Sequence, residues 1–482
     1  MFKSNLIELM RKLDPKEFRE LGEYVRSPFF NKNEGVIKLY DYISKQYPEL
    51  EEKVLKKEDV FGKLFPGTAY NEGFMKTIMF NLTRLTEDYF GYLNYRNKTD
   101  TLSQEYSIID ELFNRGLDKV FLKKLKQAED KLDKAKNKDP FYFSDKYRLQ
   151  FLKEQYLNIH QRFLNYKDVP DEDTYKSIEY LLEYFFLKIL GHHRFMYNMN
   201  KLVKFNFRNR FLDEVVEYLQ RNENQFSPQV LLHLYELLLL KENDEKYYYK
   251  TKELLRKEIN NIRKGIKYST ISILFNYASE QYYEGKQKFL SEMFELNKII
   301  TEYELYTPLE DGFFNEVKFK NAVEVGIQMK EYNWTETFIK DYKDLLHPDE
   351  KNIAANYAYS QLNFAREKYE KALGLINAGN ISNVKYKVSI KNLTLKLYYE
   401  LGWLTEAFDL VDSNRHFLSH DKVLPEHSKK MSINFLKFYN KLLKLKSNGK
   451  PLGIRNLKAE LMRANNLYER DWLQEKLNEL IS

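Results

Sequence analysis

The chain has 482 residues, of which 43% are hydrophobic, and at roughly 100–200 residues per domain this length predicts two to four domains or one long repeat array. Its 78 Lys and Arg residues exceed its 71 Asp and Glu residues by only seven, a bias too small for the concentrated positive field of a dedicated nucleic-acid-binding protein. The absence of cysteine excludes disulfide frameworks, thiolate metal sites and cysteine chemistry, and it fits a reducing compartment.

The N-terminus and the most apolar runs argue against secretion and against insertion into a membrane. Glu8 and Arg11 interrupt the first apolar stretch, which therefore does not resemble a signal peptide. The runs 180–190 and 230–240 each contain polar or charged residues and are shorter than the roughly 20 apolar residues that a spanning helix needs. We therefore predict a soluble protein located in the cytoplasm.

Residues 1–100 are predicted to form an N-terminal helical domain. Asp14 and Pro15 fit the cap and the first position of a helix, and Glu17 stands where its side chain can bond back to the cap. Apolar residues recur at helical spacing between positions 36 and 47 and again between 74 and 89. These patterns indicate a compact group of helices that ends in a polar, aperiodic stretch.

Part of this domain has two interpretations. A short helix, a turn and a longer helix over 75–90 resemble the helix-turn-helix core of winged regulators, some of which carry tetratricopeptide arrays behind that domain. A helix that reads DNA needs exposed basic side chains, because neutralisation of phosphates dominates the affinity. This helix offers only two cations, Lys76 and Arg84, against Glu87 and Asp88. We therefore favour a helical cap for the following array and keep DNA binding as the alternative.

Residues 101–311 are predicted to form a middle helical block. Ser227-Pro228 and Thr307-Pro308 each place a proline where a capped helix would begin. Long alternating strand patterns are missing, and the Asn-Gly pair at Asn448 lies between helical segments. The whole chain is therefore expected to be all-α, with around twenty helices and essentially no sheet.

Residues 312–482 carry an internal repeat. The stretches 332–338, 367–373 and 402–408 can be overlaid, and Phe338, Ala372 and Ala407 then recur at about 34–35 residues, the period of tetratricopeptide-type hairpins. Upstream, Gly326, Ser360 and Leu395 follow the same spacing. The residues that we assign to packing within the repeats are Gly326, Trp334, Phe338, Ser360, Tyr369, Ala372, Gly402, Trp403 and Ala407.

This third of the chain resembles the tetratricopeptide family. The resemblance implies an α-solenoid of stacked helical hairpins, with small residues where paired helices approach and a concave face that binds peptides or proteins. Gly402 matches the glycine of the family's turn, whereas Glu367 and Asn333 stand where glycine is usual. The segments 26–33 and 469–473 are similar to a group of uncharacterised helical bacterial proteins, a resemblance that implies no activity.

One group of residues has spacing that could suit a metal ion. Asp412, His416 and His420 follow one another at four-residue steps, with Glu426 and His427 nearby. A catalytic zinc needs three protein ligands and an open position. The helix is expected to end near His420, which would scatter the ligands, and histidines near a helix C-terminus are favoured by the dipole alone. We therefore predict no metal site.

The other histidines carry no recognisable catalytic pattern. His192 and His193 follow an apolar helix, while His160 and His233 fall within amphipathic helices, where a partly buried structural role is the more common one. Glycine-rich phosphate loops and nucleophile elbows do not occur in the sequence. We therefore predict a protein that is not an enzyme, with no catalytic residue and no cofactor.

The predicted function is that of a non-enzymatic scaffold or adaptor, which binds a protein or peptide partner on the concave face of the helical repeats. Aromatic side chains would anchor the partner, since such residues dominate interface energetics. The alternative is a transcriptional regulator with an N-terminal helix-turn-helix-like DNA-binding domain and a repeat-type sensor domain. Neither the identity of the partner nor the oligomeric state follows from the sequence.

Overall fold

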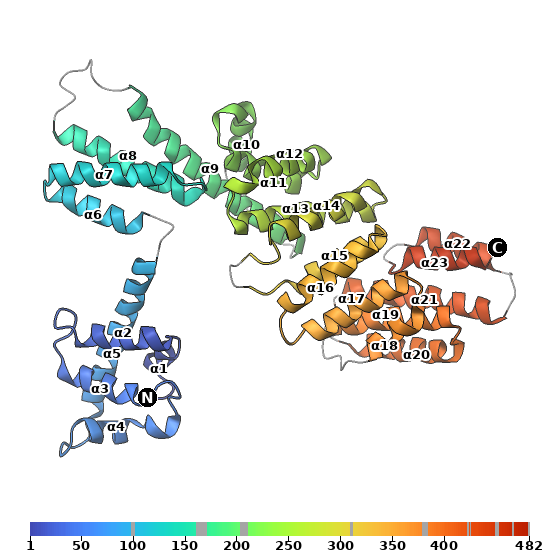
Figure 1. The fold of residues 1–482 in the computed structure, drawn as a ribbon, viewed down its shortest axis with the longest axis horizontal. Coiled ribbons are helices and arrows are strands. Elements are labelled where there is room, and N and C mark those ends of the chain that lie inside the picture. The colour runs from blue at the N-terminus through green and yellow to red at the C-terminus, as the bar shows by residue number, and fades with distance from the viewer. Residues whose placement is uncertain are drawn as a thin grey trace. The chain divides into compact units, whose positions relative to one another are not determined.

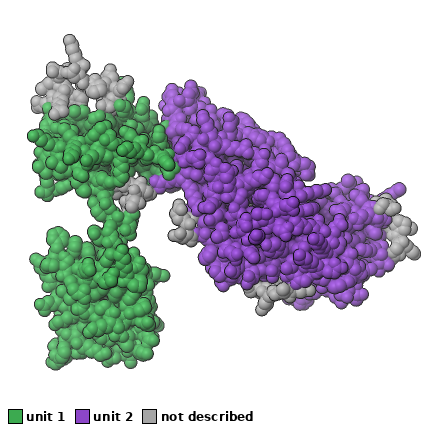
Figure 2. Space-filling view, in the orientation of Figure 1, with its two compact units in different colours: residues 1–188 green, residues 189–482 purple. Residues whose placement is uncertain are grey.

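A computed structural model of the chain describes residues 1–97, 102–160, 171–202, 211–308, 312–377, 384–421, 424, 426–448, 453–464 and 467–480. These residues form an all-α structure that divides into two compact units, 1–188 and 189–482 (Figures 1 and 2). The only β-type pairing in the described ranges is one isolated bridge between Phe314 and Leu346. The all-α prediction is thereby confirmed. None of the helices described combines the length and the apolar character that crossing a bilayer requires.

The first unit contains the N-terminal helices and the first part of α9, in which the division falls. Its helices are α1 (Asn5–Met10), α2 (Pro15–Arg26), α3 (Glu34–Ser44), α4 (Lys57–Leu64), α5 (Glu72–Asn97), α6 (Ser103–Asn114), α7 (Asp118–Asp133), α8 (Pro140–Ile159) and α9 (Asp171–Leu202). One core joins apolar side chains of residues 6–93, and a second joins those of residues 102–156. The core of α1–α5 is therefore built from those helices and the loops between them.

The second unit contains the rest of the chain. Its helices are α10 (Leu212–Arg221), α11 (Pro228–Glu242), α12 (Glu245–Glu258), α13 (Lys264–Tyr283), α14 (Lys288–Glu302), α15 (Glu316–Gln328), α16 (Tyr332–Tyr342), α17 (Lys351–Ala365), α18 (Tyr369–Asn377), α19 (Val384–Leu401), α20 (Leu404–His420), α21 (Glu426–Asn448), α22 (Ile454–Arg463) and α23 (Arg470–Glu479). Short 3₁₀ turns add Glu52–Val54 to the first unit and Glu223–Gln225, Ile259–Asn261 and Lys343–Leu345 to the second.

Helix starts follow the capping signals at two of the three predicted places. Asp14 accepts the N–H groups of Lys16 and Glu17, and the Glu17 carboxylate accepts the N–H of Asp14. Ser227 caps α11. The start predicted at Thr307-Pro308 is wrong, because Pro308 lies in a bend. Asn315 caps α15 instead, since its side chain accepts the first free N–H groups of that helix.

Consecutive helices of the second unit pack as pairs. They are α11 with α12, α13 with α14, α15 with α16, α17 with α18, and α19 with α20. In every pair the turn contains one residue in the left-handed conformation: Asn243, Gly285, Lys330, Glu367 and Gly402. This conformation costs a residue with a Cβ roughly 1–2 kcal/mol. Lys330 and Glu367 therefore hold strained turns that helix pairing stabilises.

Four of these turns are closed by the same backbone hydrogen bond, which runs from an N–H to the carbonyl five residues earlier. The bonds measure 2.9–3.0 Å and join Lys286 to Gln281, Glu331 to Gly326, Lys368 to Asn363 and Trp403 to Tyr398. The residues four positions after the donors of the last three bonds are Thr335, Ala372 and Ala407, which therefore occupy equivalent positions. The residues three positions before the acceptors are Val323, Ser360 and Leu395, which are likewise equivalent. All six residues are fully buried. The overlay of sequences instead placed Phe338 and Gly326 in the first of these repeats.

Gly326 lies at the closest approach of α15 and α16. A Cβ at this position would lie 2.3 Å from Thr335 Oγ1 and 3.2 Å from the Trp334 ring. We expect Gly326→Ala to destabilise the protein by about 1–2 kcal/mol, because overpacking outweighs the gain in helix propensity. Denaturant midpoints measure this effect. Thr335→Ala should then weaken the effect of Gly326→Ala, since it removes the colliding atom.

Gly374 provides the matched control for this experiment. It lies within α18, and a Cβ there would meet nothing within 4 Å. Gly374→Ala should therefore raise the stability, by up to about 1 kcal/mol. If the two glycine variants shifted the denaturant midpoint equally and in the same direction, the close approach at Gly326 would not contribute to the stability, and the prediction would be wrong.

Candidate functional site

The repeat residues predicted in α15 and α16 lie in the packing between helices. The Trp334 ring stacks on Phe338 with a centroid distance of 5.2 Å, and it meets the edge of Phe294 at 4.9 Å. Gly326 faces Thr335 and Trp334. These side chains join α16 to both α14 and α15, so they build the interior and do not present groups to a ligand.

The remaining predicted repeat residues divide between the interior and the surface. Ser360 and Ala372 are buried where α17 meets α18, and the Ser360 hydroxyl donates a hydrogen bond of 2.8 Å to the Ala372 carbonyl. Ala407 is buried, whereas Trp403 is 43% exposed and Gly402 lies in the turn with φ +75°. In the second set, Tyr369 lies half-buried with its ring 5.5 Å from Phe364.

The residues considered for a metal ion do not converge. His416 and His420 stack on α20 with ring centroids 4.3 Å apart, and Asp412 lies 3.4 Å from the Arg415 guanidinium. In the portion of the chain that is described, no group of three His, Asp or Glu side chains could hold a metal ion. The side chain of His427 lies outside the described residues.

A buried ionic network joins α9 to α11. Glu236 is fully buried and forms an ion pair with Arg194, and it accepts a 3.1 Å hydrogen bond from Nδ1 of His233. Burial alone would raise the pKa of Glu236, but the Arg194 guanidinium and then His233 lower it to about 2. Burial is also the main reason that the pKa of His233 is lowered. Because the Glu236 carboxylate and the His233 ring are buried, the network can stabilise helix packing, and these two groups are not accessible to a substrate.

A lysine and a serine also meet between α13 and α15. Lys318 Nζ lies 2.6 Å from Ser272 Oγ and 3.4 Å from the centroid of the Tyr268 ring. Burial lowers the pKa of Lys318 to about 7. The Ser272 hydroxyl donates a hydrogen bond of 2.6 Å to the Tyr268 carbonyl. The serine therefore accepts from the lysine, and this geometry does not activate it as a nucleophile.

Polar side chains connect the first helices of successive pairs. Lys320 on α15 donates to Ser389 on α19 at 3.1 Å and lies 3.5 Å from Glu324. Gln361 on α17 reaches the same glutamate at 3.5 Å. Positions 320 and 324 are one helical turn apart, so these groups share one face of α15. The face formed by α15, α17 and α19, called the first-helix face below, is polar and carries both signs of charge.

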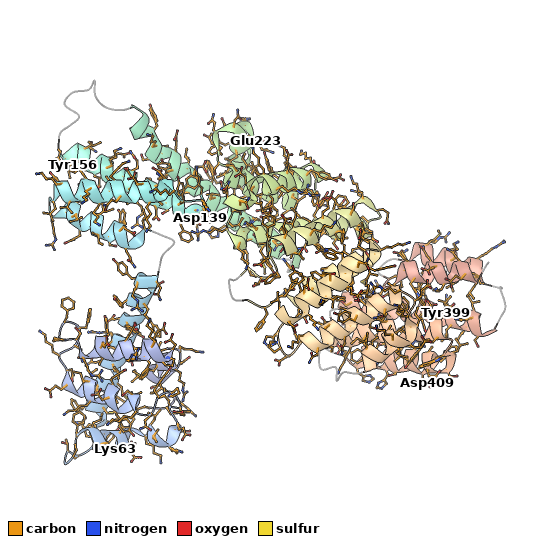
Figure 3. All side chains as sticks on the ribbon, viewed as in Figure 1. Lys63, Asp139, Tyr156, Glu223, Tyr399 and Asp409 are labelled. Carbon is orange, nitrogen blue, oxygen red and sulfur yellow. The ribbon has the colours of Figure 1, made fainter. Side chains whose placement is uncertain are left out.

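The C-terminal helix α23 packs mainly against α21 and α22, and some of its side chains also reach α19 of the first-helix face. Trp472 is buried, its Nε1 donates to Glu400 on α19 at 2.9 Å, and its ring meets the edge of Tyr399 at 5.3 Å (Figure 3 labels Tyr399). Next to it, Glu469 and Lys396 form an ion pair of 2.7 Å. These contacts join aromatic and charged side chains of α23 to buried and nearly buried residues of α19, and the sequence overlay contained no signal for them.

The helix considered for DNA reading carries few free cations. On α5, Lys76 pairs with Glu72 at 2.9 Å, while Arg84 is exposed. No strand that could form a basic wing occurs in the residues described. DNA binding by this region stays a prediction without a geometric observation in its favour.

Comparison of the chain with protein families, curated proteins and solved structures finds no match.

Proposed function

We propose that the protein is a non-enzymatic scaffold that binds a helical segment of a partner protein on the first-helix face of an α-solenoid of tetratricopeptide-like hairpins. One observation carries the proposal, namely that Trp472 of α23, a helix packed mainly on α21 and α22, also reaches Glu400 and Tyr399 of α19. The chain thus already holds one helix on the type of surface that the proposal assigns to a partner.

The arrangement of the second unit supports an array of this kind. Five helix pairs follow one another, each with one left-handed residue in its turn, and α15 contacts α17, which in turn contacts α19. In a stack of hairpins, the first helices line one side and the second helices the other. Residues at helical spacing on α15 and α19 then form one continuous surface.

Helix α13, the first helix of the preceding pair, supplies an anchor suited to a protein partner beside this surface. Tyr283, at the end of α13, is 81% exposed. Desolvation by neighbouring protein atoms, and then the carboxylates of Glu324 and Glu469, raise the pKa of its hydroxyl. A large exposed aromatic side chain beside charged groups is typical of the residues that dominate binding energy at protein interfaces.

Site-specific photo-crosslinking in cells tests the proposal. With benzoylphenylalanine in place of Tyr283, we expect a defined crosslinked partner on irradiation, since the replacement keeps an aromatic ring beside the first-helix face. Tyr249 supplies the control, because it is also exposed but lies on α12, the second helix of its pair. Crosslinks of equal yield to the same partner from both positions, or none from position 283, would refute the proposal.

A further inference from the structure

Two exposed phenylalanines stand side by side on the first unit. Phe29 is 86% exposed and Phe30 is 46% exposed. Their rings meet edge to face with centroids 4.9 Å apart, and Phe30 in turn stacks on Tyr24 at 4.1 Å. Phe29 is therefore supported from beneath by aromatic side chains while most of its surface faces water, where an apolar ring is unfavourable.

The loop that carries Phe29 is held in place by hydrogen bonds. The N–H groups of Phe30 and Asn31 donate to the Ser27 carbonyl at 3.1 and 2.9 Å. The Asn31 side chain donates to the Val25 carbonyl and accepts the N–H of Asn33, both at 2.9 Å. This loop therefore presents the ring in a defined position, which reduces the entropy that a binding partner must overcome.

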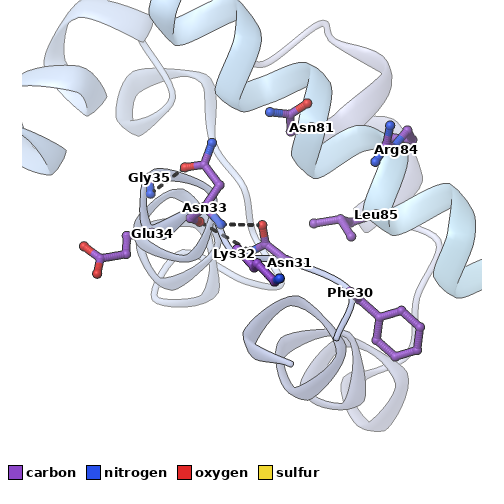
Figure 4. Close-up of a pocket in the computed structure, with 9 residues that line it drawn as sticks. All are labelled: Phe30, Asn31, Lys32, Asn33, Glu34, Gly35, Asn81, Arg84 and Leu85. Atoms are coloured by element: carbon purple, nitrogen blue, oxygen red, sulfur yellow. Dashed lines mark hydrogen bonds between the residues drawn. The ribbon is translucent and has the colours of Figure 1, made fainter. Parts of the chain in front are cut away.

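A hollow of about 610 Å³ lies next to this loop, between the start of α3 and the side of α5. Figure 4 shows its nine lining residues, which are Phe30, Asn31, Lys32, Asn33, Glu34, Gly35, Asn81, Arg84 and Leu85. Two of them are cations and one is a carboxylate. Lys32 and Arg84 are exposed, and neither has an ion-pair partner within the described part of the chain.

We propose that Phe29, Phe30, Lys32, Asn81 and Arg84 form a docking surface for an acidic peptide segment of a partner protein. An apolar side chain of that segment covers Phe29, and its carboxylates pair with Lys32 and Arg84. The site belongs to the first unit and does not depend on the first-helix face, so that each proposal can fail without the other.

The chemistry of the lining selects this occupant. The excess of cations favours a negatively charged segment, because unpaired guanidinium and ammonium groups bind carboxylates in charge-assisted hydrogen bonds. Figure 4 shows the Asn81 amide pointing toward the hollow with no hydrogen bond to the other residues drawn. An amide both donates and accepts, as an extended peptide backbone requires. The exposed Phe29 supplies the apolar anchor that charges alone lack.

Selection from a library of displayed random peptides, with the full-length protein as bait, tests this proposal. We expect the enriched peptides to contain several carboxylates beside an aromatic or large aliphatic residue. Synthetic peptides from that pool should bind about tenfold or more weakly to Phe29→Ser and to Arg84→Glu, because each variant removes one half of the recognition. Their binding should also weaken as salt is added.

Phe80→Ser is the matched control, since Phe80 is 66% exposed on α5 but does not line the hollow. This variant should bind the selected peptides as the wild type does. An empty or non-acidic pool, or equal binding to Phe29→Ser, would overturn the proposal. So would a single-stranded oligonucleotide that competes with the peptides, or self-association abolished by Phe29→Ser, since either result assigns the surface to another occupant.

Discussion

Replacement of Arg194 by methionine is expected to destabilise the second unit by about 3–5 kcal/mol, because it leaves the Glu236 carboxylate buried without a counter-charge. Glu236 is fully buried, and its carboxylate pairs with Arg194 and His233. Methionine preserves much of the apolar stem of arginine, so the lost charge dominates the effect. Denaturant unfolding, followed together with hydrogen exchange at the amides of α11, measures the change.

Two further variants separate this electrostatic effect from a loss of packing. Arg194→Met combined with Glu236→Gln should recover much of the lost stability, since no buried charge then remains unpaired. Arg256 supplies the control in the same unit, because it pairs with Glu295 at 2.9 Å but both side chains are about half exposed. Arg256→Met should cost less than about 1 kcal/mol. Equal losses at positions 194 and 256 would contradict the prediction.

The same network is expected to make the free energy of unfolding of the wild type fall as the pH is lowered, and this pH dependence is a second measurement of its contribution. The pKa of Glu236 is about 2 in the folded protein and near 4.5 when unfolded, and that of His233 is lowered from 6.5. The unfolded chain therefore binds more protons below pH 6.5 than the folded chain does. These two groups thus stabilise the fold above their unfolded pKa values and lose that contribution as the pH falls.

Replacement of Trp472 by alanine is expected to cost about 3–5 kcal/mol in the C-terminal part of the second unit. The ring is buried against Tyr399 and Tyr439, and its indole N–H bonds to Glu400. Removal of the ring opens a cavity. It also removes the indole N–H that donates to the Glu400 carboxylate, which is largely shielded from solvent. Hydrogen exchange should show α22 and α23 losing protection before α11 to α18, and limited proteolysis should cleave beyond α21 first.

Two control substitutions identify the source of this effect. Trp472→Phe retains an aromatic ring but removes the donor, so it should cost less than Trp472→Ala. Trp403→Ala removes the same side chain at a position that is 43% exposed, so it should cost less than Trp472→Ala because less buried surface is lost. Unchanged exchange in α23 of Trp472→Ala would show that this contact does not hold the helix on the first-helix face. The proposed use of that face by a partner would then lose its main support.

The helical class of the chain and several helix starts could be predicted from the sequence, because they depend on neighbours within one or two turns. Apolar residues at helical spacing in 36–47 and 74–89 correspond to α3 and α5. Asp14 and Ser227 cap the helices that follow them, because their side chains reach N–H groups only two or three residues away. The turn at Gly402 has the positive φ that glycine adopts without strain.

The left-handed turns at Lys330 and Glu367 could not be predicted in this way. Side chains with a Cβ disfavour that conformation, so it persists there only because the helices on both sides are held together by packing. The alignment of Thr335 with Ala372 follows from the backbone bonds that close those turns. For the same reason, the overlay of sequences assigned Phe338 to a position that the turns give to Thr335.

The contacts on which function would depend join residues that are far apart in the sequence. Arg194 meets Glu236 across 42 positions, and Trp472 meets Glu400 across 72. The exposure of Phe29 likewise depends on how its loop folds against α2 and α3. Helix capping and apolar periodicity depend on interactions between residues close in the sequence, so the sequence alone predicts them. The packing of helices that are distant in the sequence determines which charges become buried and which aromatic rings stay exposed to water. That packing is a property of the tertiary structure.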